Sequence, residues 1–235
     1  MYLRGNFNSS KLVHLLSGWS PVDAQVSRQD FAERLGLWLG AFDATTLHDA
    51  HRSIRSMAAP SGVRPAKAVD VEQEFHRVRD ALVKHLSATQ ASPEPAAGFA
   101  PYRRRYIDRQ RHMELKIGAL RGDVRKALAS ASPQLAQLAA LDAALDRMLD
   151  AKAQKMLATV PVLLEKRFAQ LRKSHAPVPD LAHPPADSAV QQAPDSWLHA
   201  FGKEVQEVLL AELDDRLLPV VGLIEAFNNE FKNYP

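Results

Sequence analysis

Near its carboxyl end, over residues 213–231, the chain repeats apolar side chains at alternating intervals of four and three residues. We call this row the carboxy-terminal seam, and it consists of Leu213, Leu217, Val220, Ile224, Phe227 and Phe231. Residues spaced in this way lie along one side of an α-helix. A continuous apolar row needs a second helix to cover it, as in a coiled coil. The pattern therefore predicts a long carboxy-terminal helix that packs against another helix, from this chain or from a partner.

Helical spacing of apolar residues also covers most of the remaining chain. Ser132 followed by Pro133 is a capping residue followed by proline at the first helical position, which favours the start of a new helix. Pro161 interrupts the next apolar row and predicts a kink or a restart. No segment shows the alternation of apolar and polar residues that is typical of a half-buried strand. The pattern thus predicts an all-α protein.

The order of helices and linkers predicts an elongated helical bundle with a long antiparallel helical hairpin and coiled-coil-like seams. A short turn near Ser132 should make the two arms of the hairpin antiparallel. We expect five parts that form one bundle. They are an amino-terminal helical region at 1–59, a single helix at 70–88 between linkers, the hairpin at 101–174, a disordered Pro/Ala linker at 175–194, and an acidic amphipathic helix at 195–235.

Composition narrows the class of protein further. The chain of 235 residues contains no cysteine, which excludes disulfides and thiolate chemistry. No uncharged apolar run approaches the roughly 20 residues that a membrane-spanning helix needs. The first residues also lack the apolar core of a secretory signal. We therefore expect a cytoplasmic protein without a transmembrane segment.

Charge is distributed unevenly along the chain. Residues 101–126 contain nine Arg and Lys against three Asp and Glu, whereas residues 195–235 contain three against eight. The basic segment holds a patch made of Arg103, Arg104, Arg105, Arg109 and Arg111. Arginine binds phosphates and carboxylates, and the neighbouring Tyr102 and Tyr106 could stack on bases. The patch therefore predicts an acidic protein face, a nucleic acid or anionic lipid, or only a solvated surface.

Few residues suggest catalysis or metal binding. His48 and His51 lie three apart on a predicted helix, but two histidines are too few for a metal site. No histidine follows a glutamate by three residues, as a helical di-metal centre would require. Glycine-rich phosphate loops and a nucleophile elbow are absent from the sequence. We expect no enzyme, no cofactor and no bound metal.

Two pairs of glycines lie four residues apart on predicted helices. They are Gly36 with Gly40, and Gly118 with Gly122. Because each pair shares one helical face, it could let a second helix approach closely. We interpret the pairs as packing sites inside the protein rather than as dimer faces.

Three segments, together with the spacing between them, resemble an uncharacterised family of bacterial proteins, mainly from beta- and gamma-proteobacteria. They are Glu33–Ile54 (ERLGLWLGAFDATTLHDAHRSI), Tyr102–Arg125 (YRRRYIDRQRHMELKIGALRGDVR) and Leu209–Glu230 (LLAELDDRLLPVVGLIEAFNNE). The family has no established activity, so the resemblance implies no site residues. Genes of this family can lie beside genes for other helical proteins and for a protein of outer-membrane-anchor type. The resemblance therefore implies a cytoplasmic component of an envelope-associated assembly.

These observations favour a non-enzymatic helical scaffold or adaptor, which self-associates or binds a partner protein through its apolar seam. Binding of a polyanion, either nucleic acid or anionic lipid, through the basic helix is the alternative. The sequence leaves open the partner's identity, the oligomeric state, the order of the helices in space, and whether the seam is covered within one chain.

Overall fold

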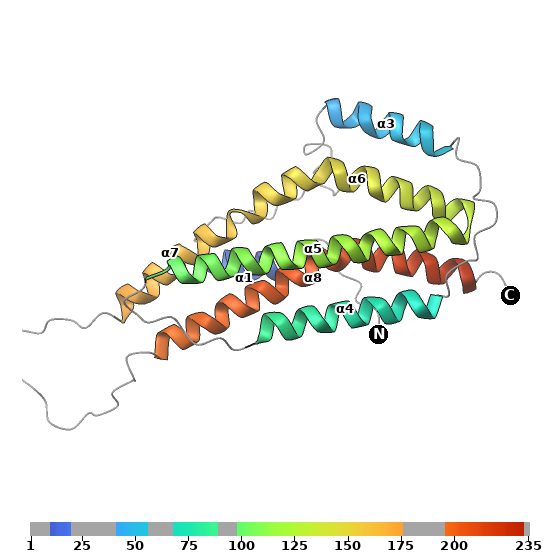
Figure 1. The fold of residues 1–235 in the computed structure, drawn as a ribbon. Helices are drawn as coiled ribbons and strands as arrows, with labels where there is room; N and C mark the ends of the chain where they lie inside the picture. The colour runs from blue at the N-terminus through green and yellow to red at the C-terminus, as the bar shows by residue number, and fades with distance from the viewer. Residues whose placement is uncertain (1–9, 20–40, 56–67, 89–97, 176–195, 233–235) are drawn as a thin grey trace, which may run out of the picture. The chain divides into compact units, whose positions relative to one another are not determined.

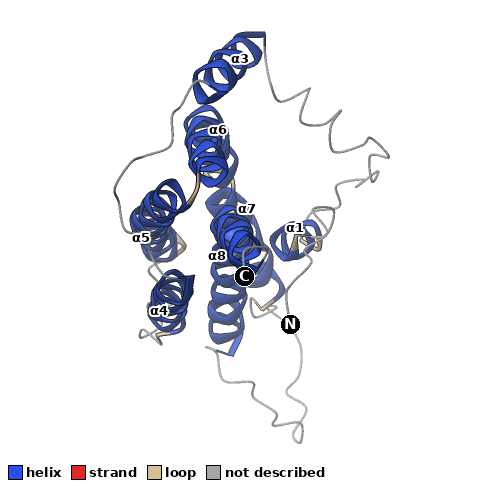
Figure 2. Ribbon diagram, turned by 90° about the vertical axis from the view of Figure 1, so that its right-hand side faces the viewer, coloured by secondary structure: helices blue, strands red, loops and turns tan. Residues whose placement is uncertain are grey.

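The computed structural model describes residues 10–19, 41–55, 68–88, 98–175 and 196–232, and every regular element in these residues is an α-helix (Figure 1). The helices are α1 (Lys11–Ser17), α3 (Ala41–Arg55), α4 (Ala68–Ser87), α5 (Ala100–Ala131), α6 (Pro133–Leu157), α7 (Val160–Ser174) and α8 (Ser196–Lys232). Figure 2 shows no strand in the part of the chain that is described. The prediction of an all-α protein is confirmed.

Several helix starts follow from local sequence signals. Ser10 caps α1, because its Oγ accepts a hydrogen bond of 3.3 Å from the backbone N–H of Val13. Ser132 caps α6 in the same way, and its Oγ accepts from the N–H of Leu135 at 3.2 Å. Pro161 lies in the first turn of α7, after the helix has broken at Ala158 and Thr159. The predicted start at Ser132 and the predicted restart at Pro161 are confirmed.

Two further residues lie inside helices rather than at their ends. Asp70 lies inside the first turn of α4, because the helix begins at Ala68. A carboxylate in that turn still interacts favourably with the helix dipole. Pro219 lies within α8, which continues on both sides of it. The predicted glycine pair of Gly36 and Gly40 lies outside the described residues.

The chain divides into two compact units, and each contains parts from distant regions of the sequence. The first unit contains α1, α7, the end of α4 from Val83, α5 up to Met113 and α8 up to Asp215. Its core holds an aromatic cluster made of Phe99, Tyr102, Phe168, Trp197 and Phe201. The ring centroid of Phe168 lies 5.2 Å from the ring centroid of Trp197 and 5.2 Å from that of Phe201. Aromatic pairs of this kind each contribute about 0.5–1.5 kcal/mol beyond their buried area.

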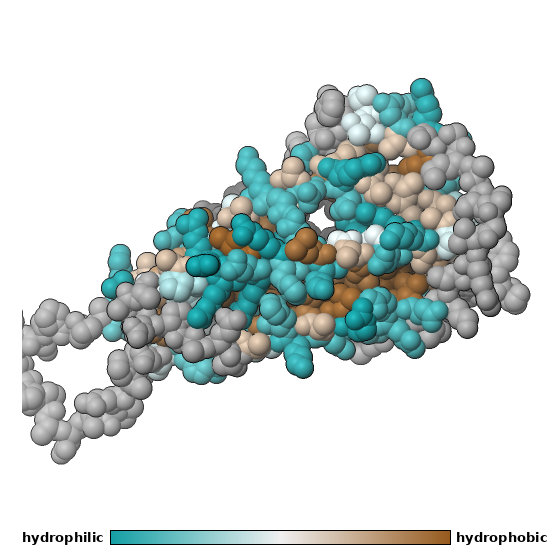
Figure 3. Space-filling view, in the orientation of Figure 1, coloured by the Kyte–Doolittle hydropathy of each residue, from teal (hydrophilic) through white to brown (hydrophobic). Residues whose placement is uncertain are grey.

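The second unit contains α3, α6, α4 up to Leu82, α5 from Glu114 and α8 from Arg216. Within it, α5 and α6 form an antiparallel hairpin, since only Ser132 separates them, and α3 lies against α6 (Figure 1). One side of α6 is buried through small and apolar side chains, namely Leu135, Ala136, Ala139 and Ala144. Figure 3 shows the first part of α6 in pale brown, in agreement with its alanine-rich sequence.

Candidate binding surfaces

The carboxy-terminal seam is covered by the chain itself. Five of its members are buried, namely Leu213, Leu217, Val220, Ile224 and Phe227. The side chain of Phe231, the sixth, lies outside what the structure describes. The structure therefore places the described seam in the protein core, which is one of the two arrangements that the sequence leaves open. In this conformation, the five side chains offer no surface to a partner.

The arginine patch lies on the first part of α5, in the first unit. Arg103, Arg104 and Arg111 are exposed, whereas Arg105 and Arg109 are partly buried. Arg104 and Arg111 are seven residues apart and therefore project in nearly the same direction. Arg111 Nη1 lies 4.0 Å from Asp108 Oδ1, and both side chains are mostly exposed. Such a surface pair contributes between zero and about 1 kcal/mol, so it leaves Arg111 able to bind another anion.

The two tyrosines beside the patch do not belong to the surface. Tyr102 and Tyr106 are both buried, and Tyr102 packs in the aromatic cluster against Phe168 and Phe201. The interpretation of these tyrosines as a platform for stacked bases is therefore wrong. Their positions on α5 place them on the side of the helix that faces the core, opposite to Arg104 and Arg111.

Glu212 is the one charged side chain that is completely buried among the described residues, and sequence reasoning missed it. The hydroxyl group of Tyr106 donates to Glu212 Oε2 at 2.6 Å, and the Gln110 side-chain amide donates to both carboxylate oxygens at 3.0 and 3.1 Å. A sequence signal was present, because Glu212 lies three residues after the buried Leu209. That spacing places its carboxylate on the apolar side of α8.

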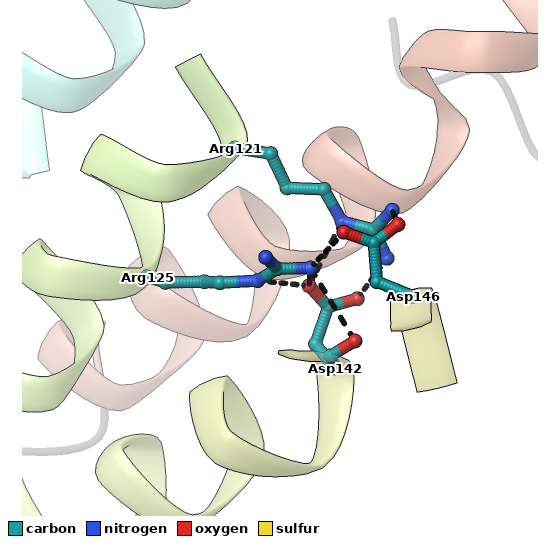
Figure 4. Close-up of polar contacts among 4 residues, drawn as sticks. All are labelled: Arg121, Arg125, Asp142 and Asp146. Atoms are coloured by element: carbon teal, nitrogen blue, oxygen red, sulfur yellow. Dashed lines mark hydrogen bonds and ion pairs between the residues drawn. The ribbon is translucent and has the colours of Figure 1, made fainter. Parts of the chain in front are cut away.

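A second polar cluster joins the two arms of the hairpin in the second unit (Figure 4). The guanidinium groups of Arg121 and Arg125, from α5, point toward the carboxylates of Asp142 and Asp146, from α6. Arg121 and Arg125 each contact both aspartates, at distances of 2.5 to 2.9 Å. Arg125 also donates to the backbone oxygen of Asp142 at 3.3 Å.

The electrostatics of this hairpin cluster indicate a structural role. Burial lowers the pKa of Arg125, but hydrogen bonds to Asp146 and Asp142 and their negative charges outweigh it, so that its pKa is raised overall. Asp142 is the better shielded carboxylate, with 13% of its side chain exposed against 39% for Asp146. Because both arginines are already paired with carboxylates of the same unit, the cluster fixes the register of α5 against α6.

The remaining candidates are exposed. His48 and His51 lie on the surface of α3, and the described residues hold no group of three or more side chains that could bind a metal ion. Gly118 is exposed and Gly122 is half-exposed, and a Cβ added at either position would meet no other atom within 4 Å. The interpretation of this pair as an internal packing site is therefore wrong, since no described element approaches these glycines closely.

The fold is that of an all-α protein. None of its described helices is long and apolar enough to cross a membrane. The chain belongs to the family described as "Protein of unknown function (DUF3348)", whose model matches residues 2–229. The predicted membership of an uncharacterised family is confirmed. No curated protein and no solved structure shows significant similarity to the chain.

Proposed function

We propose that the protein is a non-enzymatic helical adaptor that binds an acidic segment of a partner protein. The binding surface is the exposed arginine face of α5, made of Arg103, Arg104 and Arg111. Burial of the carboxy-terminal seam supports this choice, since the apolar row that the sequence suggests for binding lies in the core. The arginine face is then the surface with the most distinctive chemistry among the described residues.

The geometry of this face favours carboxylates of a protein over a nucleic acid. The only described ion pair at the three exposed arginines is the long, exposed contact between Arg111 and Asp108. Arginine forks pair well with carboxylates. Sequence-tolerant binding of single-stranded nucleic acid relies on stacked aromatic side chains, and Tyr102 and Tyr106 are buried. Three arginines on about two helical turns match the charge of a short acidic segment.

The test compares two triple variants of the full chain that remove the same charge. In the first, Arg103, Arg104 and Arg111 become Ala; in the second, the exposed Lys126, Lys166 and Lys173 become Ala. Binding to a fluorescent glutamate-rich peptide is measured at low ionic strength. With about 0.5 kcal/mol for each exposed ionic contact, the arginine variant should lose about tenfold in affinity. The lysine variant should lose far less.

Two results would contradict this proposal. Equal losses in both variants would show that only net charge matters. Tighter binding to duplex DNA or to anionic vesicles than to the acidic peptide, with the same dependence on the three arginines, would establish the polyanion alternative instead. Binding to a polyanion should also weaken steeply as the salt concentration rises, because counterions are released.

A further inference from the structure

Four basic side chains lie together on the exposed side of α3, in the second unit. We call them the α3 basic face, and they are His48, His51, Arg52 and Arg55. Their spacing of three, one and three residues places all four on one side of the helix. Each of the four side chains is exposed. The buried Ile54 lies on another side of α3, which itself lies against α6 (Figure 1).

The end of the helix explains only half of this face. Arg52 and Arg55 lie in the last turn of α3, where basic side chains interact favourably with the helix dipole. This effect falls off within one turn. His48 and His51 precede the last turn. The dipole therefore does not account for the two imidazoles that lie beside the arginines.

The hydrogen-bond donors of the α3 basic face are not used within the described part of the chain. No described residue forms a hydrogen bond or an ion pair with any of its four side chains. Asp49 lies three residues before Arg52 and is exposed, but no ion pair joins the two side chains. The face therefore presents two guanidinium groups and two imidazoles to a ligand.

We propose that the α3 basic face binds a phosphate group, either inorganic phosphate or a small phosphate monoester. Guanidinium forks match phosphate oxygens, and imidazoles supply further N–H donors. Helical neighbours three or four residues apart have Cβ atoms about 5–6 Å apart, so several of these side chains can reach one anion. A phosphate monoester offers three strong acceptor oxygens and a carboxylate offers two, so that four converging donors favour the phosphate. The site is independent of the proposed partner surface on α5.

The test uses histidine-selective NMR of the full chain, titrated with sodium phosphate at constant pH and ionic strength. The imidazole signals of His48 and His51, assigned with His48→Asn and His51→Asn, should shift and saturate, while signals of the other histidines stay in place. Arg52→Gln should weaken phosphate binding about fivefold, which is the upper end for an exposed ionic contact. The matched control is Lys116→Gln, which removes an exposed charge from α5 and should bind phosphate as the wild type does.

Two further variants separate hydrogen bonding from charge. Arg52→Lys keeps the positive charge but removes the fork, and it should still weaken phosphate binding. Asp49→Asn should tighten binding about twofold, because it removes a negative charge beside Arg52. Since the altered side chains are exposed, all variants should keep the far-UV circular dichroism of the wild type.

A parallel titration with glycerol phosphate distinguishes the two sources of the phosphate group. Tighter binding of the ester would identify a phosphate monoester as the ligand, whereas equal or weaker binding would identify free phosphate. The proposal is overturned if His48 and His51 respond to neither ligand, or if Arg52→Gln and Lys116→Gln weaken binding equally. An equally strong response to sodium acetate would also overturn it, because the face would then bind anions without preference for phosphate.

Discussion

The hydroxyl group of Tyr106 donates a hydrogen bond of 2.6 Å to the carboxylate of Glu212, and both side chains are buried. These residues lie 106 positions apart in the sequence, on α5 and α8. A buried carboxylate is stable only when hydrogen bonds replace the water that it loses on folding. In the first unit, the contact therefore fixes which turn of α8 faces which turn of α5.

Removing the Tyr106 hydroxyl should be destabilising for this reason. We expect Tyr106→Phe to lower the free energy of unfolding by about 1.5–3 kcal/mol, the usual range for a hydrogen bond to a charged group. The measurement is urea unfolding of the full chain followed by circular dichroism. In a Glu212→Gln background the same change should cost only about 1 kcal/mol, since the bond is then neutral. Equal losses in the two backgrounds would show that the carboxylate charge plays no part.

The hairpin cluster allows a comparison of two aspartates that differ in burial. Asp142→Ala should cost roughly 2–4 kcal/mol, because it leaves the largely buried Arg121 and Arg125 with one remaining carboxylate. Asp146→Ala should cost less than half as much, because Asp146 is more exposed and its charge is better hydrated. Chemical denaturation of both variants measures the difference. Similar losses would mean that the two carboxylates share the arginines equally.

The sequence was sufficient to predict the helices, but it was not sufficient to predict the polar contacts between them. The seam, the Ser132-Pro133 start and the Pro161 restart depend on neighbours within one or two turns, so that local spacing predicts them. The pairing of Tyr106 with Glu212 depends on the register between distant helices, which no local pattern contains. For the same reason the sequence suggested that Tyr102 and Tyr106 serve a surface, although their spacing equally fits the buried side of α5.

The carboxy-terminal seam offers a matched pair of neighbouring leucines. Leu217 is 2% exposed and Leu218 is 39% exposed. We expect Leu217→Ala to cost about 2–5 kcal/mol, because it removes buried apolar area and leaves a cavity. Leu218→Ala should change the stability by less than about 1 kcal/mol. Thermal and urea unfolding of the two variants provide the comparison.

A stronger variant separates core packing from self-association. The Leu217→Asp, Ile224→Asp double variant should fail to fold, because it places two charges in the core. Its far-UV circular dichroism should then show a large loss of helix. If the double variant stays helical and becomes monomeric while the wild type is an oligomer, the seam would instead be an interface between chains.

Asp215 gives a prediction for pH dependence. Its Oδ2 accepts a hydrogen bond of 2.6 Å from Ser10 Oγ. Burial raises the pKa of Asp215, the Ser10 hydrogen bond lowers it, and the charges of Asp214 and Glu212 raise it again, so that the overall shift is upward. The folded state therefore holds the Asp215 proton more tightly than the unfolded state does. This contribution to stability is present at acidic pH and is lost as the pH rises through the raised pKa.

Asp215→Asn should accordingly stabilise the protein at neutral pH, where the wild-type carboxylate is ionised. The gain should stay below about 1 kcal/mol, since the group is only half-buried and water screens its charge. It should shrink toward pH 3, below the ordinary pKa of an aspartate of about 3.9. Unfolding free energies between pH 3 and pH 8 measure this trend, with the exposed Asp80→Asn as the control. A variant that is less stable than the wild type at neutral pH would show that the Ser10 contact outweighs burial.

The glycines of α5 should be replaceable with a gain in stability. Gly118 and Gly122 lie inside a long helix, and a Cβ at either position meets no atom within 4 Å. Alanine favours the helix over glycine by about 1 kcal/mol, so Gly118→Ala and Gly122→Ala should each raise the free energy of unfolding by about 0.5–1 kcal/mol. Gly98→Ala is the contrasting control, because Gly98 has a φ of 65° and a side chain there is strained. Urea unfolding should show a higher free energy of unfolding for Gly118→Ala and Gly122→Ala and a lower one for Gly98→Ala. A lower value for Gly118→Ala or Gly122→Ala would mean that a second helix occupies this space in solution.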